Sequence, residues 1–178
     1  MTDVGGLWQI LCMEPVTLRP WSSDDLPLLR RGNTPEMTTF LNGPETDEQV
    51  QERQERYLRL AESGEARIFV ILAADQPVGS IAYWQMDWHD EPAFESGWFI
   101  VPEAQGRGIA SRALSLVIDD ARAHRGERRM LTACPAVENL ASNGVCRRNG
   151  FTLHGTFTAP FRGAELVHND WALDLTAA

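Results

Sequence analysis

One stretch of the chain, residues 94–124, most restricts how the rest can fold. It begins with an apolar run that ends at Val101, passes through Gln105-Gly106-Arg107-Gly108, and continues with apolar residues at helical spacing. The helical part has one apolar face, made by positions 110, 113, 114, 117 and 121. The stretch therefore predicts a buried strand, a tight glycine turn and a helix that packs on a sheet.

The start of that helix is suited to binding an anion. Its first N–H groups lack partners within the helix and carry partial positive charge. From Gln105 to Ala113 the only charged side chains are Arg107 and Arg112, although a helix start usually carries acids. Gly106 and Gly108 have no Cβ, so a ligand can approach the backbone closely. The alternative is that the glycines only make a tight connection, and the pattern alone leaves both interpretations open.

Two well-known phosphate motifs do not fit this turn. No Lys-Ser or Lys-Thr pair follows the second glycine, which excludes a P-loop. Ser111 stands where a dinucleotide fingerprint would have its third glycine. The pattern favours a pyrophosphate of another kind.

Two segments resemble a known family. Gln105-x-x-Gly108-x-Ala110 after an apolar strand resembles the acetyl-CoA pyrophosphate loop of the GNAT superfamily of N-acetyltransferases. Residues 139–151, with Asn-x-x-Ser-Asn and Arg-Arg-Asn-Gly-Phe, are similar to the segment that lines the pantetheine arm there. The resemblance is greatest to the branch that acetylates the N-terminal alanine or serine of ribosomal proteins. In the order of elements it covers residues 16–175.

The resemblance implies an α+β fold with three layers, α/β/α, and a mixed, mostly antiparallel central sheet. We expect one domain over residues 1–178, with residues 1–14 as a poorly ordered extension. Acetyl-CoA is the implied co-substrate. Its implied binding residues are Phe99, Ile100, Val101, Gln105, Gly106, Arg107, Gly108, Ile109, Ala110, Ser111, Asn139, Ser142 and Asn143.

Other patterns predict the remaining elements. Alternating or β-rich runs predict strands at 16–20, 66–73, 78–86, 94–101, 129–134, 151–157 and 165–175. Capping signals at Ser22 and Thr46 begin helices, and another helix spans residues 139–149. The Glu and Arg residues of the helix after Thr46 are interpreted as a solvated face with paired charges.

Transfer to an amine needs a base and a proton donor. Glu95 is the candidate base, provided that apolar neighbours such as Phe94, Trp98 or Trp88 raise its pKa; the alternative is a surface carboxylate. Many family members have a tyrosine donor seven residues after the motif asparagine, and here that position is Cys146. The resemblance instead points to Ser142 as donor to the CoA sulfur. Local backbone bonding by that serine, and donation by Cys146 or water, remain open.

The acceptor site is specified only loosely. Trp84, Trp88 and Glu95 are the candidate substrate-binding residues, although aromatic residues usually belong to the core. Acidic residues in an expected loop at positions 87, 90 and 91 would suit a cationic or amphipathic acceptor. The alternative, which the loop position favours, is that these acids are simply exposed to solvent. We expect the loop of residues 38–45 and the Phe161-Arg162-Gly163 turn to close over the site.

Composition argues against several classes of function. The net charge of −9 argues against nucleic acid and anionic membranes and mildly favours cationic partners. The chain begins without a signal peptide pattern and has no membrane-length apolar run, so a cytoplasmic location is expected. Three cysteines and four scattered histidines without ligand spacing predict neither a disulfide nor a metal site.

The leading hypothesis is an acetyl-CoA-dependent N-acetyltransferase that transfers directly to a primary amine, on a protein N-terminus or a small molecule. The alternatives are acetylation of a cationic small molecule, such as an aminoglycoside or polyamine, and a non-catalytic acyl-CoA sensor. The absent tyrosine mildly supports the sensor. The sequence leaves the identity of the amine undecided, and a homodimer is an open expectation.

Overall fold

The computed structural model describes residues 14–177, and the expectations for residues 1–13, which include Cys12, lie outside this range. The strands are β1 (Val16–Pro20), β2 (Ala66–Ala73), β3 (Gln76–Trp88), β4 (Glu91–Ile100), β5 (Met130–Ala133), β6 (Thr152–Phe161) and β7 (Ala164–Asp174). The α-helices are α1 (Leu26–Arg31), α2 (Asp47–Ser63), α3 (Ile109–His124) and α4 (Leu140–Arg148). Three short 3-10 helices are η1 (Ser23–Asp25), η2 (Thr39–Leu41) and η3 (Pro102–Ala104). No helix in the described range is long and apolar enough to cross a membrane.

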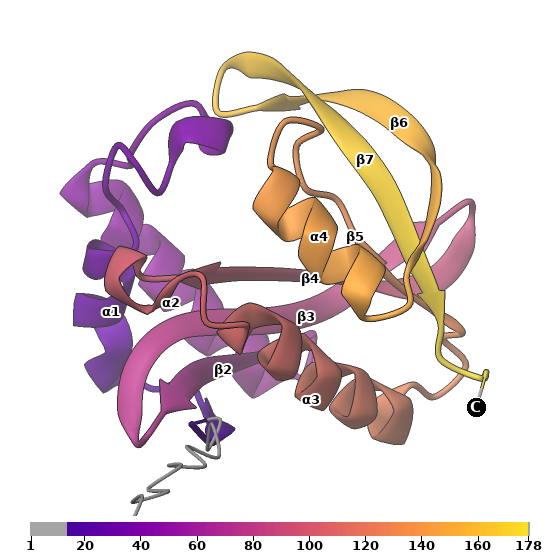
Figure 1. The fold of residues 1–178 in the computed structure, drawn as a ribbon, viewed down its shortest axis with the longest axis horizontal. Coiled ribbons are helices and arrows are strands. Elements are labelled where there is room, and N and C mark those ends of the chain that lie inside the picture. The colour runs from indigo at the N-terminus through magenta and orange to yellow at the C-terminus, as the bar shows by residue number, and fades with distance from the viewer. Residues whose placement is uncertain (1–13, 178) are drawn as a thin grey trace, which may run out of the picture.

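The strands form one seven-stranded sheet in the order β1-β2-β3-β4-β5-β7-β6 (Figure 1). Every neighbouring pair is antiparallel except β4 and β5, which run parallel. The prediction of a mixed, mostly antiparallel sheet is therefore confirmed. The parallel pair is short, because β4 and β5 are in register only over Ala93–Glu95 and Met130–Thr132. Beyond that point the two strands separate, and the sheet opens into a wedge.

Helices cover both faces of the sheet, which gives the three predicted layers. On one face the Tyr83 hydroxyl donates to Asp120 of α3 at 2.7 Å. On the other face the ring of Phe99 packs against α1 so closely that a Cβ added to Gly32 would lie 2.6 Å from it. Because side chains alternate along a strand, the odd-numbered residues of β4, including Glu95, share the face that α1 and α2 cover.

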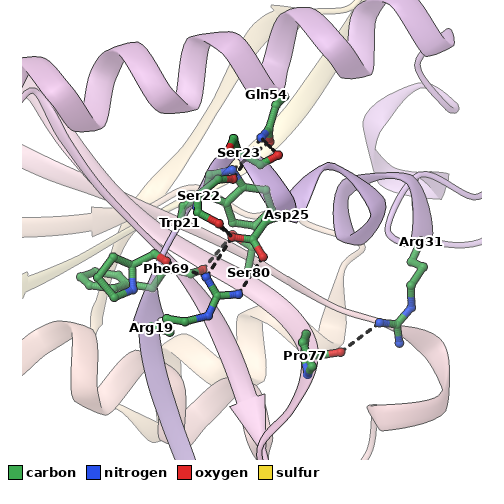
Figure 2. A network of polar contacts seen from close by, with 11 residues as sticks. Arg19, Trp21, Ser22, Ser23, Asp25, Arg31, Gln54, Phe69, Pro77 and Ser80 are labelled. Carbon is green, nitrogen blue, oxygen red and sulfur yellow. Dashed lines mark hydrogen bonds and ion pairs between the residues drawn. The ribbon is translucent and has the colours of Figure 1, made fainter.

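A polar network holds α2 on that face. As predicted, α2 begins with a capping box at Thr46, whose hydroxyl accepts from the Gln49 N–H at 3.3 Å. Gln54 of α2 is buried and accepts from the Trp21 indole N–H at 2.8 Å (Figure 2). Beside it the Asp25 carboxylate accepts from Arg19 at 2.7 Å (Figure 2). Burial alone would raise the pKa of Asp25, yet hydrogen bonds from Arg19 and Ser22 hold it below its usual value.

Two turns are tighter than the sequence suggested. The β3–β4 hairpin turns at His89 and Asp90, both with positive φ (51° and 64°), so Asp87 and Glu91 lie in strands and not in a loop. Likewise β6 extends to Phe161, and the hairpin turns at Arg162 and Gly163. Cross-strand pairing extends these strands beyond the segments of high β-propensity.

Candidate functional site

The wedge between β4 and β5 is continuous with a cavity of about 1240 Å³. One end, here called the α3 end, is lined by the start of α3, the chain after β5 and the start of α4. The opposite end, here called the α2 end, is lined by α2, the loop before it and the β6–β7 hairpin. The floor between them consists of β2, β3 and β4. A single cavity thus joins the glycine turn and Glu95.

The start of α3 has the predicted properties of an anion site. Gly108 is its N-cap with φ of +70°, and its first turn contains no acid. Gly106 also has positive φ, and a Cβ at either glycine would have no neighbour within 4 Å. The backbone therefore faces open space, as a phosphate group would require. Arg107 was predicted to bind the cofactor, but its side chain pairs with Glu14 and does not line the cavity.

The open edge of β4 supplies backbone groups to the same cavity. The Ile100 carbonyl accepts from the Gln105 side chain at 2.9 Å and so faces the opening. The Val101 N–H instead donates to Val78 of β3 at 2.9 Å. The backbone groups of successive residues in β4 point alternately toward β3 and toward the wedge. Trp98 and Ile100 therefore present their N–H and C=O groups to the wedge, whereas Phe99 lines the cavity with its side chain. The prediction for Val101 is wrong, because it is fully buried and lies outside the cavity wall.

The start of α4 forms the wall opposite β4. Asn139 caps this helix, and its side-chain oxygen accepts from the Ser142 N–H at 3.1 Å. The Ser142 hydroxyl lines the cavity and has no hydrogen-bond partner among residues 14–177. It is therefore free to donate to a ligand, while its backbone stabilises the helix start.

Asn143 was predicted to bind acetyl-CoA, but the structure gives it a different position. It is 5% exposed and lies outside the cavity wall. Its side-chain oxygen accepts from Trp171 at 2.7 Å and Asn169 at 2.6 Å, and its amide group donates to the Ala136 carbonyl at 2.9 Å. Its side-chain oxygen joins α4 to β7, and its amide group joins α4 to the segment that precedes this helix. Asn143 therefore supports the site from behind the cavity wall.

Glu95 lies on the floor, directly opposite Trp84 of β3. Burial, followed by the nearby negative charge of Asp170, raises the pKa of Glu95 to about 7. The neighbours differ from those expected, because Phe94 and Trp98 point to the other face of the sheet. Trp88 is also outside the cavity wall, since its indole N–H donates to Asp170 at 3.1 Å. A carboxyl group with this pKa can accept a proton near neutral pH.

Of the two described cysteines, only one faces the cavity. Cys146 is fully buried and outside the wall, so donation from its thiol into the cavity has no structural basis. Cys134, which sequence reasoning did not single out, follows β5 and lines the α3 end. Burial, with Glu95 and Asp170 nearby, raises the pKa of Cys134 to about 12. It is therefore a neutral thiol near neutral pH. Its position at the point where β4 and β5 separate was not visible in the sequence.

The α2 end is closed by two segments that are distant in sequence, as expected. The Asn42 side chain donates to the Arg162 carbonyl at 2.9 Å, and Arg162 donates to the Gly43 carbonyl at 3.2 Å. Glu45 pairs with both Arg53 and Arg162 at 2.8 Å. The interpretation of the α2 charges as a solvated face fails here, because Arg53, Arg56 and Tyr57 line the cavity. The sequence did contain a signal for this arrangement, because Arg56 and Tyr57 follow Arg53 by three and four residues, a spacing that places all three on one face of the helix.

Comparison with known proteins agrees with this geometry. The family model "Acetyltransferase (GNAT) domain" matches residues 16–152. The chain is similar to the ribosomal-protein-serine acetyltransferase of Escherichia coli (strain K12), with 32% identity over 118 residues. This match spans 65% of the chain and 65% of that relative's length.

Solved structures show the same fold. The ribosomal alpha-N-protein acetyltransferase RimL in complex with coenzyme A superposes with a TM-score of 0.75 at 23% identity, over 89% of this chain and 93% of that one. The spermidine N-acetyltransferase from Vibrio cholerae, in complex with CoA and spermine, gives 0.73 at 20% identity, over 90% and 96%. At sequence identities of 23% and 20%, the similarity to these two structures shows a shared fold.

Proposed function

The chain belongs to the acetyltransferase (GNAT) family, and from this we propose that it transfers an acetyl group from acetyl-CoA directly to a primary amine. The observation that carries the proposal is that one cavity contains both an uncapped helix start and a carboxyl group with a pKa of about 7. The first suits the donor and the second suits proton removal from an amine. We also propose that residues 1–178 form a single domain that acts in the cytoplasm.

The residues at the α3 end fit acetyl-CoA. The free backbone N–H groups at the start of α3 would hold the pyrophosphate, where Gly106 and Gly108 leave room. The pantetheine arm would lie along the open edge of β4, where Trp98 and Ile100 offer backbone groups. Asn139 and Ser142 would line its other side. The activated thioester supplies the acetyl group.

Two side chains would move the protons. An amine must be neutral to attack, and in this proposal Glu95 accepts its proton, directly or through water. The leaving sulfur then needs a proton, and the free hydroxyl of Ser142 donates it. Trp84 beside Glu95 would exclude water from the reacting amine.

The favoured acceptor is a protein N-terminus. The support is the similarity to a relative that is described as a ribosomal-protein-serine acetyltransferase. A small-molecule amine is the second candidate, because the cavity is closed at the α2 end by the loop and hairpin contacts. A non-catalytic sensor is less well supported, because a sensor has no need for a carboxyl group of raised pKa beside the donor.

Thiol release from acetyl-CoA, measured with panels of N-terminal peptides and small amines, tests the proposal. We expect turnover with at least one class of amine and thermal stabilisation by CoA. Stabilisation by CoA without turnover of any amine would favour the sensor. A lack of CoA binding would contradict the whole proposal.

A further inference from the structure

The α2 end of the cavity contains three arginines. Arg53 and Arg56 come from α2, and Arg162 comes from the β6–β7 hairpin. Glu45 is the carboxylate that pairs with Arg53 and with Arg162, at 2.8 Å each. Arg56 forms no ion pair within residues 14–177. Glu36, in the loop before α2, also lines the cavity. Three positive charges therefore stand against two negative ones, and of these two only Glu45 is paired with an arginine among the described residues.

These guanidinium groups affect one another. Burial lowers the pKa of Arg162, and the positive charges of Arg53 and Arg56 lower it further, while Glu45 opposes them. The Arg53 Nε atom is buried and has no hydrogen-bond partner among the described residues. The side chains of Arg53 and Arg162 are partly buried, at 16% and 26% exposure, whereas Arg56 is exposed. An anion placed between these groups would offset the repulsion among them.

The arginines line the same cavity as Glu95. Tyr57, next to Arg56 on α2, lines it too, and the floor of this cavity carries Trp84 and Glu95. An acceptor that extends from Glu95 toward the α2 end would therefore place its next groups near the arginines. A polyamine or an aminoglycoside would bring additional cations there, which Coulomb repulsion disfavours.

We infer that the acceptor carries an anionic group, a carboxylate or a phosphate, close to the amine that is acetylated. Arg56 and Arg162 bind that group, and Arg53 holds Glu45 in place beside Arg162. Arginine suits this role because its planar group binds carboxylate and phosphate through paired hydrogen bonds. The inference rests on the proposed acetyl transfer and specifies its substrate. It also reverses the expectation from the overall charge of −9, since the local charge at the α2 end is positive.

Matched peptides test the inference. Four peptides share a free N-terminal serine and differ at positions two to four, which are all Glu, all phosphoserine, all Gln or all Lys. We expect kcat/KM to be at least ~10-fold higher for the Glu or phosphoserine peptide than for the Lys peptide, about the size of one charge-assisted hydrogen bond. The Glu and phosphoserine arms distinguish the two sources of negative charge. Equal rates for all four, or a preference for Lys, would overturn the inference while leaving acetyl transfer intact.

Charge reversal on α2 provides the matched variants. Arg56→Glu should remove the preference for acidic peptides and improve the Lys peptide. Arg59→Glu is the control, because Arg59 is exposed on the same helix, changes the net charge equally and lies outside the cavity wall. If both variants change the preference equally, a specific contact is excluded. Circular dichroism and CoA binding report that each variant is folded.

A binding measurement separates this inference from the proposed function. Calorimetry with CoA-loaded protein needs no transfer step, and we expect the Glu peptide to bind more tightly than the Lys peptide. Tighter binding of acidic peptides without turnover would contradict the acetyltransferase proposal alone. Turnover without any charge preference would contradict the anionic acceptor alone.

Discussion

Trp84 lies directly opposite Glu95 in the β3–β4 register, on the floor of the cavity. The Trp84 indole lies over the neighbouring Gly97, where an added Cβ would be 3.2 Å from it. Burial disfavours ionisation of Glu95 most, and Asp170 adds a negative charge that disfavours it further. The pKa of Glu95 is therefore near the pH at which a base is most useful. The strand register, and not any local motif, produces this environment.

We expect the rate to rise with pH through an apparent pKa near 7, because the ionised form of Glu95 accepts the amine proton. Glu95→Gln should remove this limb and lower kcat by ~100-fold. Asp170→Asn, which removes the neighbouring charge, should shift the limb to lower pH without removing it. Stopped-assay profiles of kcat/KM against pH measure both effects. A limb that persists unchanged in Glu95→Gln would assign it to another group.

The same shift predicts how stability depends on pH. The folded-state pKa of Glu95 is raised from 4.5 to about 7, so the folded state binds the proton more tightly and stability falls as pH rises between these values. Glu95→Gln avoids this loss. At pH 8 the variant should therefore be more stable than the wild type, by ~3 kcal/mol at most, with no difference of this origin near pH 4. Urea denaturation at the two pH values provides the measurement, and an equal difference at both would contradict it.

Gly108 tests the anion site. Gly108→Ala should weaken CoA binding, because a Cβ would enter the open space at the helix start and φ of +70° strains an alanine. Gly126→Ala is the matched control, since Gly126 also has positive φ but lies beyond the other end of α3. Both variants should lose ~1 kcal/mol of stability. Only Gly108→Ala should change the CoA dissociation constant measured by calorimetry.

Ser142 tests the proton donor. Ser142→Ala keeps the backbone N–H that Asn139 caps and removes only the free hydroxyl. We expect kcat to fall by ~10-fold or more with little change in CoA affinity. Ser142→Thr, which keeps a hydroxyl group, should recover part of the rate. Unchanged turnover in Ser142→Ala would leave water as the donor.

Asn143 tests the support of the site. Asn143→Ala leaves the buried indole N–H of Trp171 without an acceptor and should destabilise the fold by ~2–3 kcal/mol. Asn169→Ala, which removes one partner of the same oxygen, should cost less because Asn169 is only partly buried. Thermal melts compare the two variants. A loss of CoA affinity in folded Asn143→Ala that exceeds its stability effect would instead favour direct ligand contact.

Local patterns predicted much of the fold. The capping box at Thr46, the strand–glycine–helix unit around Gly108 and the helix capped by Asn139 all depend on residues close in sequence. Local hydrogen bonding and periodicity determine such units, so they can be recognised without knowing the tertiary structure. The ends of β3 and β6 were less predictable, because their pairing partners extend them.

The sequence by itself determined the strand–glycine–helix unit around Gly108, the place of Ser142 near the start of α4 and the place of Glu95 on the central strand. Only the tertiary structure decided that Asn143 and Trp88 face away from the cavity and that Arg53, Arg56 and Arg162 meet there. The physical reason is that side-chain direction and electrostatic environment depend on packing between distant segments. A residue on α2 and a hairpin more than a hundred residues later come together only when the sheet opens between β4 and β5.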